Sequence, residues 1–269
     1  MNGKRISVVS YTAFLVCLVI LLFSCKGEKK TVFKKLSSSE TGIEFVNKPE
    51  EHKLFNILYY LYYYNGGGVA AGDINNDGLT DLYFTANNKG GNKLYINKGN
   101  FQFEDITDKA GVTGQSDWCS GVTMGDINGD GLLDIYVSAV ASSWGLKGHN
   151  ELFINNGNNT FSERSAEYGL DFSGLSTQAV FFDYDHDGDL DCYLLRHSKK
   201  PHANIVDTSN RKNIDSLAGD KLLRNELDHG EKKFTDVSTQ AGIYQSSLGY
   251  GLGIAIADVN NDGWEDIYV

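Results

Sequence analysis

Short apolar runs alternate with polar, glycine-rich segments along most of this chain. Four such runs follow one another in the first repeating unit: GVAAGDI at 68–74, DLYFTAN at 81–87, KLYINKG at 93–99 and FQFEDIT at 101–107. The runs are rich in β-branched and aromatic residues with period-two alternation, which is typical of strands. Asn and Gly clusters between the runs indicate hairpins. The pattern therefore predicts a unit of four antiparallel strands.

The second half of this unit recurs twice more along the chain. NKLYINKGNFQFEDITDKAGV (92–112) is matched by NELFINNGNNTFSERSAEYGL (150–170) and, less closely, by DKLLRNELDHGEKKFTDVSTQAGI (220–243). Units of this length with four short strands are typical of β-propeller blades. We therefore predict an all-β fold of four-stranded antiparallel blades, with three complete units and the start of a fourth.

A nine-residue acidic motif, D-x-[ND]-x-D-G-x-x-D, joins the first two predicted strands of every unit. It reads DINNDGLTD at 73–81, DINGDGLLD at 126–134, DYDHDGDLD at 183–191 and DVNNDGWED at 258–266. Ca²⁺ is a hard cation that takes several oxygen ligands in a flexible geometry. The Gly at position 6 permits the positive φ that a sharp reversal needs. Crowded carboxylates repel one another unless a cation neutralises them, so we predict about one Ca²⁺ per repeat and up to four in the chain.

The predicted calcium ligands are the side-chain oxygens at positions 1, 3, 5 and 9 and the backbone carbonyl at position 7. Loop three alone has a carboxylate at position 3, and we expect it to bind calcium most tightly because ligand charge tunes affinity. An EF-hand is excluded, because position 12 is never Glu and the flanks are strand-like. The predicted ligands are Asp73, Asn75, Asp77, Leu79 and Asp81; Asp126, Asn128, Asp130, Leu132 and Asp134; Asp183, Asp185, Asp187, Asp189 and Asp191; and Asp258, Asn260, Asp262, Trp264 and Asp266.

These loops and their flanking strands resemble the FG-GAP or VCBS repeat of the integrin α-subunit propeller and of many bacterial surface proteins. The stretches YYYNGGGVAAGDINNDGLTDLYFTANN and NKLYINKG are most similar to bacterial lipoproteins in which such repeats precede an ASPIC/UnbV domain. The resemblance covers about residues 40–269 and implies a propeller of about seven blades. We therefore expect an N-terminal part of a longer protein, in which the aromatic run ILYYLYYY (57–64) supplies a strand that closes the ring.

The N-terminal segment predicts export. Residues 1–24 combine a basic start at Lys4 and Arg5 with the apolar run TAFLVCLVILLF, which is typical of a signal peptide. The sequence LFSC resembles a bacterial lipobox, which implies lipidation of Cys25 and a membrane-anchored lipoprotein in the outer membrane of a Gram-negative bacterium. Residues 25–40 are charged and Ser-rich and are predicted to be a flexible tether, followed by the propeller at 41–269.

The net charge limits the possible binding partners, and the positions of the cysteines argue against a disulfide. The net charge is −11, but thirteen of the 35 acidic residues stand at the side-chain ligand positions of the four loops. The acidity is therefore largely ligand charge, and without a basic patch a nucleic-acid partner is excluded. Cys119 and Cys192 are predicted to be unpaired, because they occupy opposite ends of strands, farther apart than a disulfide allows.

The sequence contains no recognisable catalytic motif: G-x-S-x-G, H-E-x-x-H and the phosphate loop are all absent. We therefore predict a non-enzymatic binding, adhesion or scaffold module with a protein or glycan ligand. Two alternatives are a polysaccharide-active lyase or hydrolase and a component of a surface nutrient-uptake complex. Convergence of His197 and Lys199 on one cleft would favour the enzyme.

Two features outside the repeat are candidates for ligand contacts. Trp118 and Trp144 lie near predicted blade boundaries and either stack on sugars or pack between blades. The third unit carries an insertion at 194–213 that is either a ligand-binding element or a solvated loop. The candidate contacts in the insertion are Arg196, His197, Lys199, Lys200 and His202.

Overall fold

The computed structural model describes residues 31–51, 53–199 and 208–269. The predicted signal peptide, Cys25, Lys200 and His202 therefore lie outside the described residues. The chain divides into two compact units, residues 1–37 and 38–269. All the elements below belong to the second unit, which begins with the helical turn α2 (Ser38–Thr41).

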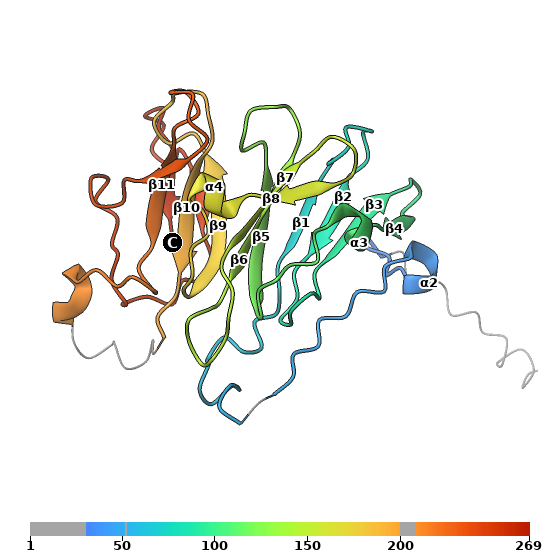
Figure 1. The fold of residues 1–269 in the computed structure, drawn as a ribbon, viewed down its shortest axis with the longest axis horizontal. Helices are drawn as coiled ribbons and strands as arrows, with labels where there is room; N and C mark the ends of the chain where they lie inside the picture. Colours follow the sequence, from blue (N-terminus) through green and yellow to red (C-terminus); the bar gives the residue numbers. More distant parts are fainter. Residues whose placement is uncertain (1–30, 52, 200–207) are drawn as a thin grey trace, which may run out of the picture. The chain divides into compact units, whose positions relative to one another are not determined.

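The predicted four-stranded units are confirmed. The described residues form three four-stranded sheets and one two-stranded sheet, each antiparallel and each ordered along the chain (Figure 1). Blade 1 contains β1 (Val69–Gly72), β2 (Asp81–Phe84), β3 (Lys93–Asn97) and β4 (Phe103–Asp105). Blade 2 contains β5 (Cys119–Gly125), β6 (Asp134–Ala139), β7 (Glu151–Asn155) and β8 (Phe161–Glu163). Blade 3 contains β9 (Ser176–Phe182), β10 (Asp191–Arg196), β11 (Lys221–Asn225) and β12 (Phe234–Asp236), and the fourth unit contains β13 (Ala255–Ala257) and β14 (Asp266–Tyr268).

One-turn helices follow the last strand of the first two blades. They are α3 (Thr107–Ala110) and α4 (Ser165–Tyr168), and each ends at a glycine in the left-handed region, with φ of 75° at Gly111 and 68° at Gly169. Glycine suits this C-terminal position because it has no Cβ to clash. These turns direct the chain from the last strand of one blade to the first strand of the next. A 3-10 helix, η2 (Thr208–Lys212), lies in the insertion of the third unit.

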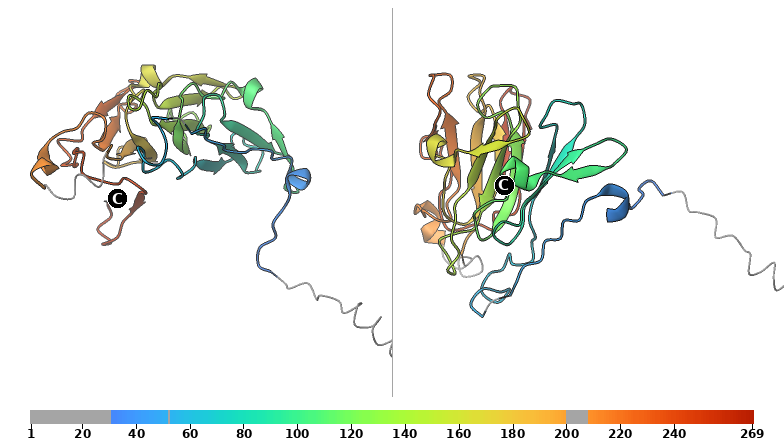
Figure 2. Two further views of the ribbon diagram at one scale, coloured as in Figure 1. Left: turned by 90° about the horizontal axis from the view of Figure 1, so that it is seen from below. Right: turned by 45° about the vertical axis from the view of Figure 1, so that its right-hand side comes forward.

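The blades pack against one another through alternate side chains of their central strands. In β6, Ile135 and Val137 join the apolar core shared with blade 1, whereas Tyr136 joins the core shared with blade 3. Burial of each such large side chain stabilises the fold by about 1.5–3 kcal/mol. The first strands β1, β5 and β9 are in contact in succession. Figures 1 and 2 show the blades following one another in chain order.

The aromatic run at 57–64 does not form a strand, so that prediction is wrong. Residues 57–64 fold into turns, and Tyr60, Tyr62 and Tyr63 are each 6% exposed or less. The three rings pack with Phe55 and Trp118 in a cluster that also includes blade residues. Aromatic rings contribute large buried areas, and packing against the ends of the blades buries them more completely than an edge strand would.

The segment before this run covers the first blade. Phe45 stacks on Phe84 of β2 with ring centroids 5.0 Å apart. The Asn47 side-chain amide donates a hydrogen bond to Asn87 Oδ1 at 2.7 Å. Cys119 and Cys192 are free, buried thiols, as predicted. Among the described residues, no helix has the length and apolar character needed to cross a bilayer.

Candidate metal centres and a pocket at the opposite end of the blades

All four acidic loops share one backbone arrangement. In loop one, the two carboxylate oxygens of Asp73 accept the backbone N–H groups of Asp77 at 3.1 Å and Gly78 at 2.7 Å. The carboxylate at position 5, Asp77, accepts the N–H of Leu79 at 2.9 Å. The corresponding bonds recur in the other three loops. Positions 1 and 5 are thereby held facing the interior of each loop.

Two positions in each loop adopt left-handed backbone conformations. Position 6 is the predicted glycine, with φ of 83°, 85°, 100° and 90° in the four loops. At each of these glycines a Cβ would meet nothing within 4 Å, so conformation rather than space requires glycine. Position 4 also has positive φ, at Asn76, Gly129, His186 and Asn261. The sequence signal for position 4 was available, because Asn and Gly favour this region.

The aspartate at position 9 serves a buried structural role. In blades 1 to 3 it is 0% exposed. Asp134 accepts backbone N–H groups from Ile127 at 3.1 Å and Asn155 at 2.8 Å, which ties the loop to β7. Burial raises the pKa of Asp134 to about 7, and the same cause raises the pKa of Asp191 to about 7. Each oxygen keeps a further acceptor site, so these carboxylates are available to a cation.

Loop three brings together the densest group of carboxylates. One oxygen each of Asp183, Asp185 and Asp187 lie within 4.8 Å of one another, and Asp187, Asp189 and Asp228 form a second such group. Asp185 Oδ1 is buried without a hydrogen-bond partner among the described residues. Desolvation and the neighbouring Asp187 raise the pKa of Asp185. Asp228 was not predicted, because it lies in the β11–β12 connection outside the motif.

In blades 2 and 3, an asparagine at the end of the third strand links the blade to the acidic loop of the preceding blade. The Asn155 side chain donates to the carbonyl of Ile74, at position 2 of loop one, at 2.8 Å. Asn225 donates to Ile127, at the same position of loop two, at 3.1 Å. The equivalent residue of blade 1, Asn97, donates to Thr80 within its own blade at 2.9 Å. The loops are therefore connected from blade to blade.

Loops three and four are also in direct contact. The His186 ring stacks on Trp264 with centroids 4.3 Å apart and an interplanar angle of 4°. His186 Nε2 lies 3.0 Å from Glu265 Oε2, and this partner raises the pKa of the imidazole. The side chains at positions 4 and 7, which the motif leaves variable, thus join neighbouring loops.

The basic residues at the start of the insertion do not form one exposed surface, which corrects their assignment to the insertion. Arg196 and His197 are each 2% exposed. The Arg196 guanidinium donates to Ser216 O at 2.7 Å. His197 Nε2 is 3.3 Å from Tyr60 Oη, and burial lowers the pKa of His197 to about 4. β10 continues to Arg196 and carries Arg196 and His197 inward, whereas Lys199 is exposed. His197 and Lys199 therefore line different pockets.

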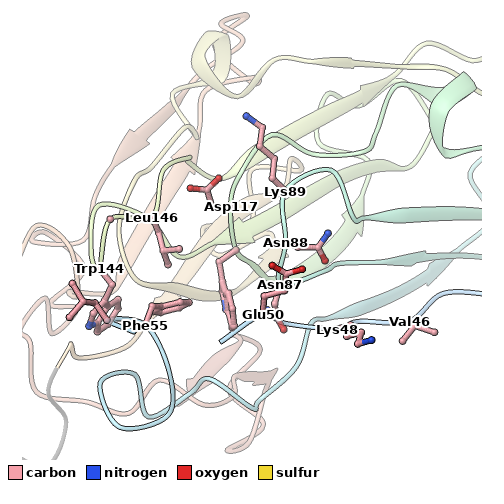
Figure 3. Close-up of a pocket in the computed structure, with 13 residues that line it drawn as sticks. Val46, Lys48, Glu50, Phe55, Asn87, Asn88, Lys89, Asp117, Trp144 and Leu146 are labelled. Atoms are coloured by element: carbon pink, nitrogen blue, oxygen red, sulfur yellow. The ribbon is translucent and has the colours of Figure 1, made fainter. Parts of the chain in front are cut away.

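A pocket of about 730 Å³ lies at the end of the blades opposite to the acidic loops (Figure 3). The connection β2–β3, the segment before β5 and the connection β6–β7 meet here, and the chain at 46–55 completes the walls. Trp144 and Phe55 lie side by side in Figure 3, and Lys89 and Asn88 lie across from them. Trp118 is 4% exposed and packs in the aromatic cluster, whereas Trp144 is only partly buried.

Four-stranded antiparallel blades, each with an acidic loop in its first hairpin, define a repeat protein of the β-propeller type. The family model described as FG-GAP-like repeat matches residues 73–137 and 139–194. The chain therefore contains FG-GAP-like repeats, as the sequence resemblance predicted.

Two curated relatives carry the same name, cartilage acidic protein 1. The protein from Xenopus tropicalis is 29% identical over 210 residues, and the protein from Mus musculus is 26% identical over 209 residues. Each alignment covers 76% of this chain but only 28% of the relative. The chain thus spans less than a third of the length of the curated relatives it matches.

A solved structure of an Agrocybe aegerita lectin, described for its specific recognition of non-reducing terminal N-acetylglucosamine, is also similar. It has a TM-score of 0.34 and 16% sequence identity, and the match covers 66% of this chain and 41% of the lectin chain. A similarity at this level bears neither on the fold nor on the ligand of this chain.

Proposed function

We propose that this chain is a calcium-stabilised binding or scaffold module, exported and anchored in the outer membrane of a Gram-negative bacterium by a lipid on Cys25. The calcium proposal rests above all on the grouped carboxylates of Asp183, Asp185 and Asp187 in loop three. The export and anchoring proposals rest on residues 1–25 alone. The binding role rests on the FG-GAP-like repeats.

The donor set fits calcium. The predicted ligands of each loop are oxygen atoms from carboxylates and a backbone carbonyl, together with an amide oxygen in loops one, two and four, and Ca²⁺ prefers such ligands. Positions 1 and 5 would hold the ion with position 3, and the buried oxygen of Asp185 would gain a partner that it otherwise lacks. A bound calcium ion supplies positive charge that offsets carboxylate repulsion. The loop residues themselves fix the first hairpin of each blade.

A binding role is favoured over catalysis by the surroundings of His197. Its side-chain partner is the hydroxyl of Tyr60, whose pKa is raised by burial, so the tyrosine stays protonated. His197 is itself neutral near pH 7, because burial lowers its pKa. Lys199 lines another pocket. The convergence that would have favoured a polysaccharide-active enzyme is therefore missing from the described residues.

The decisive experiment is a calcium titration followed by thermal unfolding. We expect calorimetry to show up to four bound Ca²⁺ ions and calcium to raise the melting temperature by more than about 10 °C relative to EDTA. A single ion at 100-fold excess over its Kd stabilises the folded state by about 2.7 kcal/mol, and each kcal/mol raises the melting temperature by about 2–4 °C at this chain length. An identical melt in EDTA would refute the proposal.

The anchor is tested separately from the calcium sites. In the bacterial host we expect the intact protein to sediment with outer membranes, and the Cys25→Ser variant to lose the lipid and leave the membrane fraction. Unchanged membrane association of this variant would exclude the lipid anchor without affecting the calcium proposal.

A further inference from the structure

We propose that the pocket beside Trp144 binds a short, neutral oligosaccharide. This inference rests on the proposed role as a binding module and names its ligand class. The pocket, of about 730 Å³, falls in the size range of small-molecule sites. It lies at the opposite end of the strands from the acidic loops, so its occupancy is separable from calcium binding.

The first observation is that Trp144, which forms an aromatic wall of the pocket, has a strained backbone conformation. Trp144 has φ of 53°, which is an outlier for a bulky residue and marks a position that the surroundings hold in place. The turn is fixed by the N–H of Ser142, which donates to Leu146 O at 3.1 Å. The Trp144 ring also packs 5.8 Å from Phe55 and 4.9 Å from Tyr60. The indole is therefore packed against neighbouring aromatic rings, and Lys199 Nζ lies 5.4 Å from its ring centroid.

The second observation is a polar rim that faces this wall. The side chains of Lys48, Glu50, Asn88 and Lys89 line the pocket, and all four residues are exposed. Figure 3 shows Lys89 and Asn88 on the side of the pocket away from Trp144. Asp117 uses one carboxylate oxygen for the N–H of Lys147, at 2.8 Å, and retains the other. Donors and acceptors are thus both available.

These two walls match the chemistry of a sugar ring. A pyranose presents an apolar C–H face, which packs on an aromatic ring, and an edge of hydroxyl groups that both donate and accept hydrogen bonds. The charged lining residues are two lysines and two acids, with a formal sum of zero. This balance gives no preference for an anion or a cation, so the favoured ligand is neutral.

A peptide strand is a poorer match. Peptides that add to a sheet need a strand edge with open backbone groups. The residues lining this pocket lie outside the strands of the four sheets. The aromatic wall is also confined to one side, which suits a flat ring better than an extended chain with alternating side chains.

The test uses the purified protein in calcium buffer and five neutral trisaccharides: cellotriose, maltotriose, xylotriose, mannotriose and N,N′,N″-triacetylchitotriose. We expect saturation-transfer NMR and calorimetry to detect at least one of them with a Kd of about 1 mM or tighter. Trp144→Ala should weaken that binding at least about tenfold. Phe101→Ala is the matched control, because Phe101 is 69% exposed in the connection between β3 and β4 and lies outside both the pocket and the acidic loops, and it should leave the sugar affinity unchanged.

A second variant guards against misfolding of Trp144→Ala. Asn88 and Lys89 are exposed, so the double variant N88A/K89M should fold and bind the sugar several-fold more weakly. Failure of all five sugars to bind, or binding that neither variant weakens, overturns the proposal. Trp144-dependent binding of peptides from a casein digest, with no sugar bound, overturns it as well. Calcium binding without sugar binding would refute this inference alone, and sugar binding with no calcium bound would refute only the metal sites.

Discussion

The two ends of the blades are built in different ways. At the loop end one hydrogen-bonded arrangement recurs four times, with the position 1 carboxylate accepting the N–H groups of positions 5 and 6. At the opposite end the contacts are individual, and segments far apart in the chain meet around Trp118 and Trp144. The repeat therefore supplies the scaffold. The contacts that occur only once, such as those around Trp144, arise where non-repeated segments meet.

The largest effect expected at the loop end is removal of a buried position 9 carboxylate. In EDTA, Asp134→Ala should lower the free energy of unfolding by about 3 kcal/mol, because two buried N–H groups lose their acceptor. The control is Asp126→Ala, whose hydrogen bonds are exposed and whose loss should cost about 1 kcal/mol or less. Urea unfolding measures both. Equal effects would show that position 9 has no special structural role.

A comparable effect at the opposite end depends on pH. The folded-state pKa of His197 is about 4, below its ordinary value of 6.5. The unfolded chain therefore binds more protons between these values, and the His197 contribution of about 3 kcal/mol is present above pH 6.5 and lost as the pH falls toward 4. Replacement by Phe should remove this dependence of stability on pH.

The pH test must compare the stability of His197→Phe with that of the parent chain at each pH, because other buried groups also titrate. Burial raises the pKa of Asp134 and Asp191 to about 7 and of Asp220 to about 6. These groups have the opposite sign, because their protonation favours the folded state as the pH falls. In unfolding experiments in EDTA at pH 4.5, 5.5 and 6.5, the stability of His197→Phe should rise relative to that of the parent chain as the pH falls. Parallel curves would contradict a buried neutral imidazole.

The links between blades should have an intermediate effect. Asn225→Ala removes one buried hydrogen bond, to Ile127 O at 3.1 Å, and one partly buried hydrogen bond, to Leu190 O at 3.2 Å, and should cost about 1–2 kcal/mol. Asn97→Ala is the matched control, because its side chain donates to Thr80 O in an exposed position. We expect the control to cost less than half as much in urea unfolding. A larger cost for Asn97→Ala would refute the inter-blade role.

The smallest expected effect concerns the difference in calcium affinity between loop three and the other acidic loops. Asp185→Asn should weaken calcium binding at loop three about tenfold, which corresponds to about 1.4 kcal/mol, because it removes one ligand charge. The reciprocal variant Asn128→Asp should strengthen loop two. In EDTA, Asp185→Asn should be neutral or slightly stabilising, since Asp187 no longer faces a second charge. Site-resolved titration that ranks loop three among the weakest sites would contradict the prediction.

Much of the fold could be predicted because its signals are local. The hairpins follow from alternating apolar residues and from turn residues, and a glycine such as Gly78 shows its conformation in the sequence alone. The aromatic run at 57–64 was misjudged for the opposite reason. Strand propensity is decided by packing partners, and the partners of Tyr60 and Tyr63 include Val140 and Leu175, far along the chain.

The candidate sites show the same difference between local signals, which the sequence reveals, and long-range contacts, which it does not. The ligand types in the acidic loops were readable, because nine consecutive residues contain them. The burial of Asp134, the inter-blade bond of Asn225 and the approach of Asp228 to loop three were not, because each depends on a neighbouring strand or hairpin. Similarly, Arg196 and His197 looked like parts of a charged insertion until β10 carried them inward.

By itself, the sequence determined the repeat, the antiparallel blades and the oxygen-rich loops, since these depend on spacing and on backbone preferences within a few residues. Only the tertiary structure decided which carboxylates are buried, how one blade is bonded to the next and that Trp144 faces Asn88 and Lys89 across a pocket. These features arise where distant segments pack together and exclude water. The burial of a residue and the partners it contacts therefore depend on all of those segments rather than on any single one.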